Sequence, residues 1–481
     1  MEGLRGDLRG DLFRAADVET PADLYDPFQS LGQKDLDRHS GDLSLSGVRG
    51  RHAPLLRAFR ADESAEYYAT WAPDPFVSYV SDAATNGLQL QNIIAVGAHT
   101  LTAGVDYTAI DTRSRAFSGA SEERAPFTPN AAASAAALFA ETKLSLLSGR
   151  LVTTLGGRVD RTSLGLRSTP LRSDIVPGTA AFTVFSPSAG AQLTAGGGVR
   201  VHGTVGSAFV APDAFRKAGL SLQSGRSGAI VTVGNAGLAA ERSLTYDVGV
   251  GLERRELGVN ADVTYFRTRV DDRITPVFAA FPTASAPRTS AGDTVATVIT
   301  YANANEARME GVEWRVGYDL GARAGYRYSL RIFANATHIW RAEERVRGVA
   351  VDAARFAGRT DFLPEEVLGA LSFTGERERD IYSVADAALN YGIEYDDLRR
   401  ISVRVAGRYV GERLDQDFTD SRFPDVRYPA FATLDAVATL RLGERYTAAF
   451  LVDNLTDENY YEKRGFSLPG RSLRLRLSAE M

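Results

Sequence analysis

The segment "SLRLRLS", residues 472–478, alternates leucine with polar residues without a break. Successive side chains of a β-strand point to opposite faces of its sheet. Three leucines therefore share one face of this strand, and Arg474 and Arg476 lie on the other. The same period of two recurs along the chain, most clearly in "VRVHGTVGSAFV" (199–210), "VNADVTYFRT" (259–268), "YRYSLRIFANATHIW" (326–340), "RISVRVAGRYVG" (400–411) and "FATLDAVATLRL" (431–442).

The strands that this alternation predicts are longer than those of ordinary soluble sheets. They run to about 9–13 residues, whereas about 5–6 is usual and a tilted strand needs about 9–11 to cross a bilayer. Their polar faces carry charged residues such as Arg200, Asp262 and Arg331. A water-filled or plugged lumen accepts such side chains, whereas a dry sandwich core does not. We therefore expect an all-β fold, a transmembrane antiparallel β-barrel with about 17–18 strands.

Tyrosines lie near many of the predicted strand ends, which fits aromatic girdles at the two surfaces of a bilayer. The alternative is the general enrichment of tyrosine in strands. The tyrosines concerned are Tyr265, Tyr301, Tyr326, Tyr328, Tyr409, Tyr428, Tyr446, Tyr460 and Tyr461.

The segments between the predicted strands are of two kinds. Residues 148–150 and 252–257 are short turns. Longer polar loops are predicted at 110–131, 161–180, 212–240, 271–297, 341–362 and 412–428. Short turns on one rim and long loops on the other are typical of an outer-membrane barrel.

Two domains are predicted from the position of the first strands. The first strand candidates lie at 42–50 and 54–63, and residues 87–112 form a clear hairpin. We therefore predict an irregular N-terminal segment, or the remnant of an early barrel strand or loop, over 1–41. The barrel itself is predicted over 42–481.

Composition argues against several classes of function. The chain has 481 residues, a net charge of -5 and no cysteine, and its five histidines are far apart in sequence. Scattered arginines in a slightly acidic chain argue against nucleic-acid binding. No P-loop, nucleophile elbow or zinc-protease motif occurs. No apolar run reaches the length of a transmembrane helix, and the N-terminus has no signal-peptide core. We expect no catalytic residue, no metal site and no cofactor.

Four stretches of the chain carry motif-like residues in a fixed order. They are 185–215, 233–253, 301–314 and 454–481. Their residues of interest are, in order, Pro187, Phe209 and Pro212; Gly234, Asn235 and Glu241; Asn303, Gly311 and Glu313; and Asn454, Leu455, Asp457, Tyr460, Pro469, Gly470 and Arg471. With these residues the chain resembles the barrel domain of TonB-dependent outer-membrane receptors. Most have a structural interpretation: Asn454 and Asp457 cap a turn, and Gly311 lets a strand bend or pass close to its neighbour.

The resemblance implies a receptor in the cell outer membrane that takes up a scarce solute, such as an iron–siderophore or cobalamin, energised through TonB. The implied partners are outer-membrane lipid, the barrel-assembly machinery, a small-molecule ligand and the TonB complex, which acts through a plug and TonB-binding segment not recognised in this chain. Barrels of this type have about 22 strands, which suggests that the plug and roughly the first four strands are missing. A smaller closed barrel is the alternative, and in either case the last strand is expected to pair with the first.

Arginines in the long loops are the predicted ligand contacts, because a guanidinium suits catechol, carboxylate and phosphate groups. They are Arg288, Arg345, Arg355, Arg359 and Arg422. Solvated loop charges are the alternative for these residues. The alternatives for the whole chain are a passive porin-like or plugless barrel and a non-functional truncated receptor.

Overall fold

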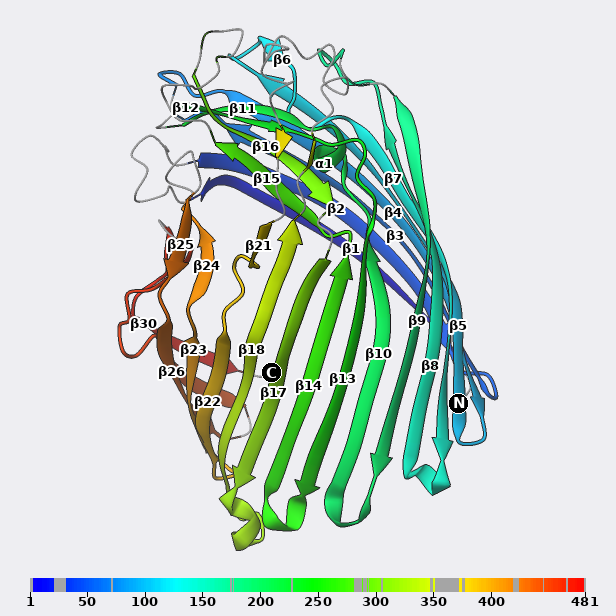
Figure 1. Cartoon of the computed structure of the whole chain (residues 1–481). Helices are drawn as coiled ribbons and strands as arrows, with labels where there is room; N and C mark the ends of the chain where they lie inside the picture. The colour runs from blue at the N-terminus through cyan, green and yellow to red at the C-terminus, as the bar shows by residue number, and fades with distance from the viewer. Residues whose placement is uncertain are drawn as a thin grey trace.

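One antiparallel sheet of 20 strands forms the wall of the molecule (Figure 1). The computed structural model describes residues 3–20, 32–70, 72–173, 175, 177–225, 228–280, 288, 292, 294–303, 306–346, 349–350, 372–373, 377–417, 424–443, 445–463 and 466–479. Two strands of the sheet are short, β6 (Glu123–Arg124) and β21 (Arg377–Asp380). The other eighteen confirm the predicted count of about 17–18. They are β1 (Leu4–Thr20), β2 (Gly32–Gly47), β3 (His52–Tyr68), β4 (Val77–Val96), β5 (His99–Phe117), β7 (Ala131–Leu146), β8 (Leu151–Leu166), β9 (Gly178–Thr194), β10 (Val199–Val210), β13 (Glu241–Arg254), β14 (Val259–Asp271), β17 (Glu306–Asp319), β18 (Ser329–Val346), β22 (Ala387–Asp396), β23 (Ile401–Val410), β26 (Phe431–Leu442), β27 (Tyr446–Asp453) and β30 (Ser472–Ala479).

Each long strand pairs antiparallel with the next one along the chain, and the sheet curls round as a barrel wall (Figure 1). Among the described residues β1 pairs with β2 and β30 with β27, and no pairing joins β1 to β30. Closure of the wall by these two strands therefore stays a prediction. Residues 1–41 contain β1 and the first part of β2, and the 87–112 hairpin consists of the second half of β4, the turn and most of β5.

The alternation of side chains gives the wall an apolar outer face and a polar inner face. Large apolar side chains such as Val263, Val316 and Leu475 are exposed on the outside. Their chain neighbours Asp262, Arg315 and Arg474 point to the other face, because successive residues of a strand alternate. This arrangement confirms the membrane-barrel pattern predicted from the sequence. Among the described residues, no helix is long and apolar enough to cross a membrane.

The two rims of the wall differ as predicted. Tight turns join strands at the lower rim in Figure 1, including short 3₁₀ turns at Leu147–Gly149 and Arg255–Leu257. Two of the connections at the opposite rim, predicted as loops over 212–240 and 271–297, are instead folded. They contain α1 (Ala214–Ala218), β11 (Leu220–Gly225), β12 (Gly228–Val233), β15 (Ile274–Ala280) and the start of β16 (Val295–Asn303).

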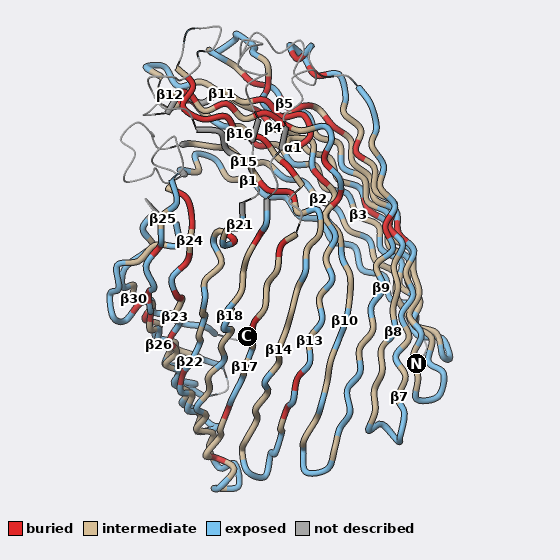
Figure 2. The backbone as a smooth tube through the Cα atoms, in the orientation of Figure 1, coloured by how far each residue is buried: buried red, intermediate tan, exposed pale blue. Residues whose placement is uncertain are grey.

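These five elements form a separate unit, which we call the cap. Its strands pair in the order β11-β12-β16-β15, and the β12–β16 pair is parallel. Buried residues gather at this end of the molecule (Figure 2), among them Val231, Val295, Thr297 and Val298, which are almost completely buried. The cap therefore has a buried core of its own, although its segments were predicted to be polar loops.

The wall strands are also longer than predicted. Strands β1 to β9, short β6 excepted, have 16–20 residues. The reason is that their outer faces become charged towards the long-loop rim, as at Arg60 and Asp62 of β3, so that the alternation of apolar and polar residues ends before the strand does. Such strands continue past the thickness of a bilayer.

The predicted aromatic girdle holds for only part of the tyrosines. Tyr265 is on the outer face, where its ring lies 6.4 Å from Tyr246 and stacks on Trp340 at 5.9 Å. Tyr326 and Tyr446 are exposed at the short-turn rim. In contrast, Tyr301 belongs to cap strand β16 and Tyr428 is fully buried in β25 (Asp425–Tyr428), so neither of these two is a girdle residue.

Candidate functional site

The inner wall carries an ion-pair cluster that joins β10 to β14 across the intervening strand β13. Arg200 of β10 and Asp262 of β14 approach to 2.6 Å, and the His202 ring nitrogen lies 3.3 Å from the same carboxylate. Thr264 donates its hydroxyl to Asp262 at 3.0 Å. These groups confirm the predicted polar lumen face, and their opposite charges neutralise each other.

A hollow of about 810 Å³ opens on this part of the inner wall. Its lining is rich in donors and charges and comes from strands β7 to β17. The polar side chains that line it are Lys143, Thr154, Ser188, Gln192, Arg200, His202, Thr204, Asp262 and Arg315. Such a surface suits a polar solute or a polar protein segment better than an apolar ligand.

Side chains from the motif stretches fix the base of the cap. Asn235 donates to the Tyr301 carbonyl at 2.9 Å, and Asn303 accepts from the Ala239 amide at 2.9 Å. The Glu241 carboxylate accepts from the Ile274 amide at 2.7 Å. Residues from two separate predicted motifs therefore join the connection after β10 to the connection after β14.

Two buried cations hold other segments to the cap. The Arg172 guanidinium donates to the carbonyls of Pro126 and Ala218 at 2.7 and 2.9 Å. The Lys217 ammonium donates to the Ala236 and Leu238 carbonyls. Backbone carbonyls replace the water that each buried cation loses, so these contacts tie the cap to the neighbouring connections.

A row of aromatic rings attaches one side of the cap to the wall. Tyr79 of β4 stacks on Phe127 with ring centroids 4.3 Å apart. Phe127 meets Phe215 of α1 edge-on at 6.3 Å, and Phe215 meets Tyr301 of β16 at the same distance. Edge-to-face and stacked pairs of this kind stabilise beyond their buried area.

The other side of the cap is held by a buried carboxylate of β18. Glu344 is 1% exposed, and it forms ion pairs with Arg273, which precedes β15, and with Arg379 of β21. Arg379 also donates to the Thr275 hydroxyl of β15 at 3.3 Å. Burial lowers the pKa of Arg273, and so does nearby Arg379, whereas Glu241 opposes that shift. The cap is thus joined to β4 by rings and to β18 by charges, and it bridges the mouth between them.

The predicted ligand arginines do not come together in the described residues. Arg288 is in an isolated bridge opposite Thr294 and donates to the Gly292 carbonyl at 2.8 Å. Arg345 lies at the end of β18, 3.9 Å from Glu378 of β21, and faces away from the lumen. Arg355, Arg359 and Arg422 lie outside the described residues.

The C-terminal motif residues make the predicted turn. Asn454 and Asp457 both have positive φ, 50° and 57°. The Asn454 side chain accepts from the Glu458 amide at 2.9 Å and donates to the carbonyls of Glu458 and Pro469. Asp457 accepts from the Arg471 amide at 2.8 Å, so the turn also holds the start of β30.

The remaining motif residues have structural surroundings. Tyr460 packs on Phe431 at 4.7 Å, and the Leu455 amide donates to the Leu434 carbonyl. Gly311 lies opposite a bulge, where a Cβ atom would come within 2.5 Å of the His338 carbonyl. A Cβ atom added at Gly234 would come within 2.5 Å of the Ala218 nitrogen, and one added at Gly470 within 2.9 Å of the Asp457 carboxylate. Pro187, Phe209 and Glu313 are wall residues of β9, β10 and β17, and Pro212 is buried between β10 and α1.

No sequence pattern marks the charged residues that hold the cap. Arg172, Lys217, Glu344 and Arg379 occur in segments that look like ordinary polar loops or strand ends. Among the described residues, no cluster of three His, Cys, Asp or Glu side chains is arranged to hold a metal ion.

A wall that is apolar outside and polar inside, with folded connections at one rim, defines the class of membrane β-barrels. Residues 4–455 match the family described as TonB dependent receptor-like, beta-barrel, and the chain belongs to that family.

Solved structures of this fold include several receptors and transporters. The siderophore receptor PirA from Acinetobacter baumannii is 15% identical with a TM-score of 0.65, and the match covers 93% of this chain and 62% of that one. The copper transporter OprC is 16% identical, with a TM-score of 0.68 over 94% of this chain and 66% of that one. The hemophore receptor HasR from Serratia marcescens, solved with its hemophore HasA and heme, is 16% identical with a TM-score of 0.66 over 99% and 68%. The chain thus spans just under two thirds of the length of the first two, and no curated protein matches it in sequence.

Proposed function

We propose that this chain is the barrel of an outer-membrane receptor that takes up a scarce solute with energy supplied through TonB. The observation that carries the proposal is the combination of an apolar outer wall, a charged inner wall and a cap that bridges one mouth. A passive pore needs no folded cap, whereas a receptor needs a surface that recognises its cargo before it enters the lumen. The TonB complex and the barrel-assembly machinery are the proposed protein partners.

The cargo is proposed to be a polar chelate or cofactor. Similar barrels are a siderophore receptor, a copper transporter and a hemophore receptor, so one wall serves several cargoes. The selecting groups are therefore expected in the long connections and the cap. Arg288, Arg355, Arg359 and Arg422 remain the proposed contacts for an anionic part of the ligand. Arg345 faces away from the lumen, so it is not among these proposed contacts.

Uptake by cells tests this proposal. The chromosomal gene is deleted and restored, and uptake of radiolabelled iron–siderophores, heme, copper and cobalamin is measured in strains with and without TonB. We expect one cargo to enter only when both the gene and TonB are present. Uptake that persists without TonB, or a large steady conductance of the purified protein in a planar bilayer, would instead identify a passive barrel.

A further inference from the structure

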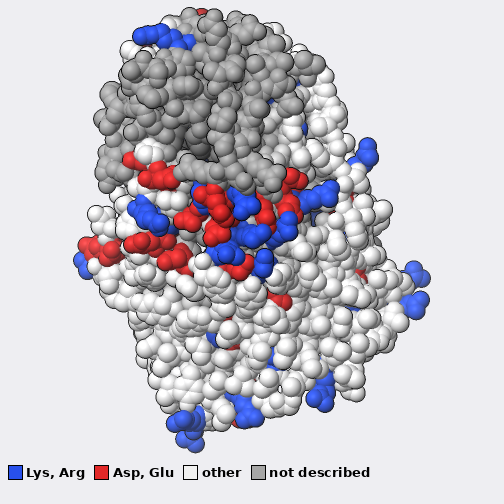
Figure 3. Space-filling model, in the orientation of Figure 1, with Lys and Arg blue, Asp and Glu red and all other residues white. Residues whose placement is uncertain are grey.

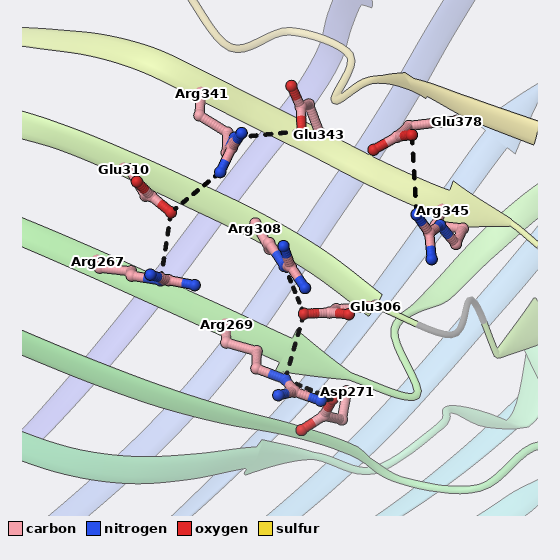
Figure 4. Close-up of polar contacts among 10 residues, drawn as sticks. All are labelled: Arg267, Arg269, Asp271, Glu306, Arg308, Glu310, Arg341, Glu343, Arg345 and Glu378. Atoms are coloured by element: carbon pink, nitrogen blue, oxygen red, sulfur yellow. Dashed lines mark hydrogen bonds and ion pairs between the residues drawn. The ribbon is translucent and has the colours of Figure 1, made fainter.

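A charged surface lies on the outside of the wall, next to the long-loop rim (Figure 3). We call it the outer-wall lattice, and Figure 4 shows its members in detail. They are Arg267, Arg269 and Asp271 of β14; Glu306, Arg308 and Glu310 of β17; Arg341, Glu343 and Arg345 of β18; and Glu378 of β21.

The register of the strands places these residues on the outer face. Arg267 and Arg269 follow the exposed Val263 at spacings of four and six residues, so they share its face. Arg269 lies directly opposite Arg308, and Arg308 lies opposite Glu343. On β18 a bulge at Trp340 interrupts the alternation of outward and inward side chains, so that both Trp340 and Arg341 face outwards.

The lattice begins just beyond the outer-face aromatic rings of Tyr246, Tyr265 and Trp340. Arg267 is two residues beyond Tyr265, whose ring stacks on Trp340. Two residues of a strand tilted by about 40° rise roughly 5 Å along the membrane normal. Outer-face aromatic rings mark the interface of a bilayer, and the headgroup layer is about 5–8 Å thick. The first row of the lattice therefore lies at headgroup level.

Arginine forms the outermost layer of the lattice. The central carboxylates Glu306 and Glu310 are only 19% and 12% exposed. Each is shared by two guanidiniums: Arg269 and Arg308 lie 3.4 and 2.5 Å from Glu306, and Arg267 and Arg341 lie 3.2 and 3.5 Å from Glu310. These four arginines are 35–53% exposed.

At the centre of the lattice, four arginines share the two carboxylates Glu306 and Glu310, so the local net charge there is positive. Acidic residues at the edges of the lattice bring its total charge back to zero. Each guanidinium has five N–H donors, of which the ion pairs within the lattice engage one or two. Guanidinium forks match phosphate oxygens, and such contacts strengthen where water is partly excluded.

We propose that the arginines of the outer-wall lattice bind the phosphate groups of lipids in the leaflet around the long-loop rim, so that this face is a lipid-headgroup site. The occupant is a phosphorylated membrane lipid. The site lies directly beyond the outer-face aromatic rings and the apolar band, and the acyl chains of the same lipid would lie against that band.

Native mass spectrometry of the purified protein in detergent micelles tests the site. The probe is a diphosphorylated lipid A, compared with the same lipid from which the phosphates have been removed. We expect the protein to retain the phosphorylated form and to release the dephosphorylated one. The triple variant Arg267→Gln, Arg308→Gln, Arg341→Gln should retain the phosphorylated lipid roughly tenfold less strongly. Circular dichroism confirms that each variant keeps its strand content.

Two matched variants separate binding from a structural role. Arg255→Gln, Arg323→Gln, Arg399→Gln removes the same charge from the short-turn rim and should leave lipid retention unchanged. Glu306→Gln, Glu310→Gln removes the carboxylates that neutralise the four arginines and should strengthen retention of the phosphorylated lipid. A lattice that only holds strands together would lose stability in both lattice variants with no gain in binding.

Three results would overturn the proposal. One is equal retention of the two lipids, which would show that acyl chains alone bind. The second is an unchanged triple arginine variant. The third is full displacement of the lipid by inorganic phosphate at millimolar concentration, which would show a free-anion site instead. Each of these results is independent of solute uptake, so failure of the lipid site is distinguishable from failure of the proposed transport.

Discussion

Single residues fix the turns on which the wall strands depend. Asn454 is 4% exposed and holds the left-handed backbone that opens the last turn, and its amide group makes bonds to both ends of that turn. Asparagine tolerates this backbone better than most residues. This one side chain therefore links the end of β27 to the residues just before β30.

The substitution Asn454→Ala is expected to lower the free energy of unfolding by about 1–3 kcal/mol, because several side-chain hydrogen bonds are lost and a positive φ is imposed on alanine. Urea unfolding of the protein in lipid vesicles measures the change. Asn454→Gly keeps the backbone conformation and loses only the hydrogen bonds, so it should be less damaging than alanine. Equal values for the two would rule out a backbone contribution.

Asp397 in the turn between β22 and β23 is expected to titrate at unusually low pH. Backbone amides of Ile401, Arg400 and Arg399 donate to its carboxylate at 2.7–2.9 Å and lower its pKa. Because the pKa in the folded state lies below that of the unfolded chain, its stabilising contribution is present above about pH 4. The contribution is lost as the pH falls through the folded pKa. Carboxyl chemical shifts in an NMR titration measure the effect, which Asp397→Asn should abolish.

At the level of secondary structure, the wall was predictable and the cap was not. The strands of the wall alternate because one face meets lipid and the other the lumen, and that period can be read directly from the residues. Cap strand β16 is buried on both faces, so its sequence "VATVITYAN" shows no period of two. The charges that dock the cap are Arg273 just before β15, Glu344 of β18 and Arg379 of β21, and no local pattern connects residues so far apart in sequence.

Replacement of the buried carboxylate is expected to loosen the cap. Glu344→Gln leaves Arg273 and Arg379 without their counter-charge, which costs about 3–5 kcal/mol at a buried site. Hydrogen exchange of the β15 and β16 amides should then become faster, while exchange in the wall stays the same. The matched control is the adjacent Glu343→Gln on the outer face, where the expected cost is about 0–1 kcal/mol. Equal exchange in the two variants would contradict the docking role of Glu344.

On the scale of the whole molecule, the two faces of the wall define how it sits in a bilayer. A charge in the middle of the apolar band is expected to be far more costly than one in the lumen. Val316→Lys on the outer face of β17 should lower the free energy of unfolding by about 2–4 kcal/mol. Thr337→Lys on the inner face of β18, opposite Glu313, should be nearly neutral. Unfolding in lipid vesicles compares the two, and similar values would contradict the assigned faces.

The sequence alone was sufficient to predict the fold class, the strand count and the difference between a rim of short turns and a rim of long connections. It was not sufficient for the outer-wall lattice, because charged residues on an outer face look the same as lumen residues once the alternation is broken. Arg345 illustrates the difficulty: it was predicted as a loop residue that contacts ligand, and in the structure it ends β18 on the outside of the wall.

The bulge at Trp340 has a consequence for how this wall tolerates mutation. One extra residue on β18, opposite Gly311, shifts the phase of everything that follows. Without the bulge, a strand that kept Trp340 would turn Arg341, Glu343 and Arg345 inwards and Glu344 outwards, because successive residues alternate. Deletion of Trp340 itself would instead leave a regular strand in which these four residues keep their present faces. Deletion of Trp340 is therefore expected to be better tolerated than deletion of Ala342, which would shift Glu343, Glu344 and Arg345 to the opposite faces. Folding yield of the two deletion variants in lipid vesicles compares them, and equal yields would contradict the role of the bulge.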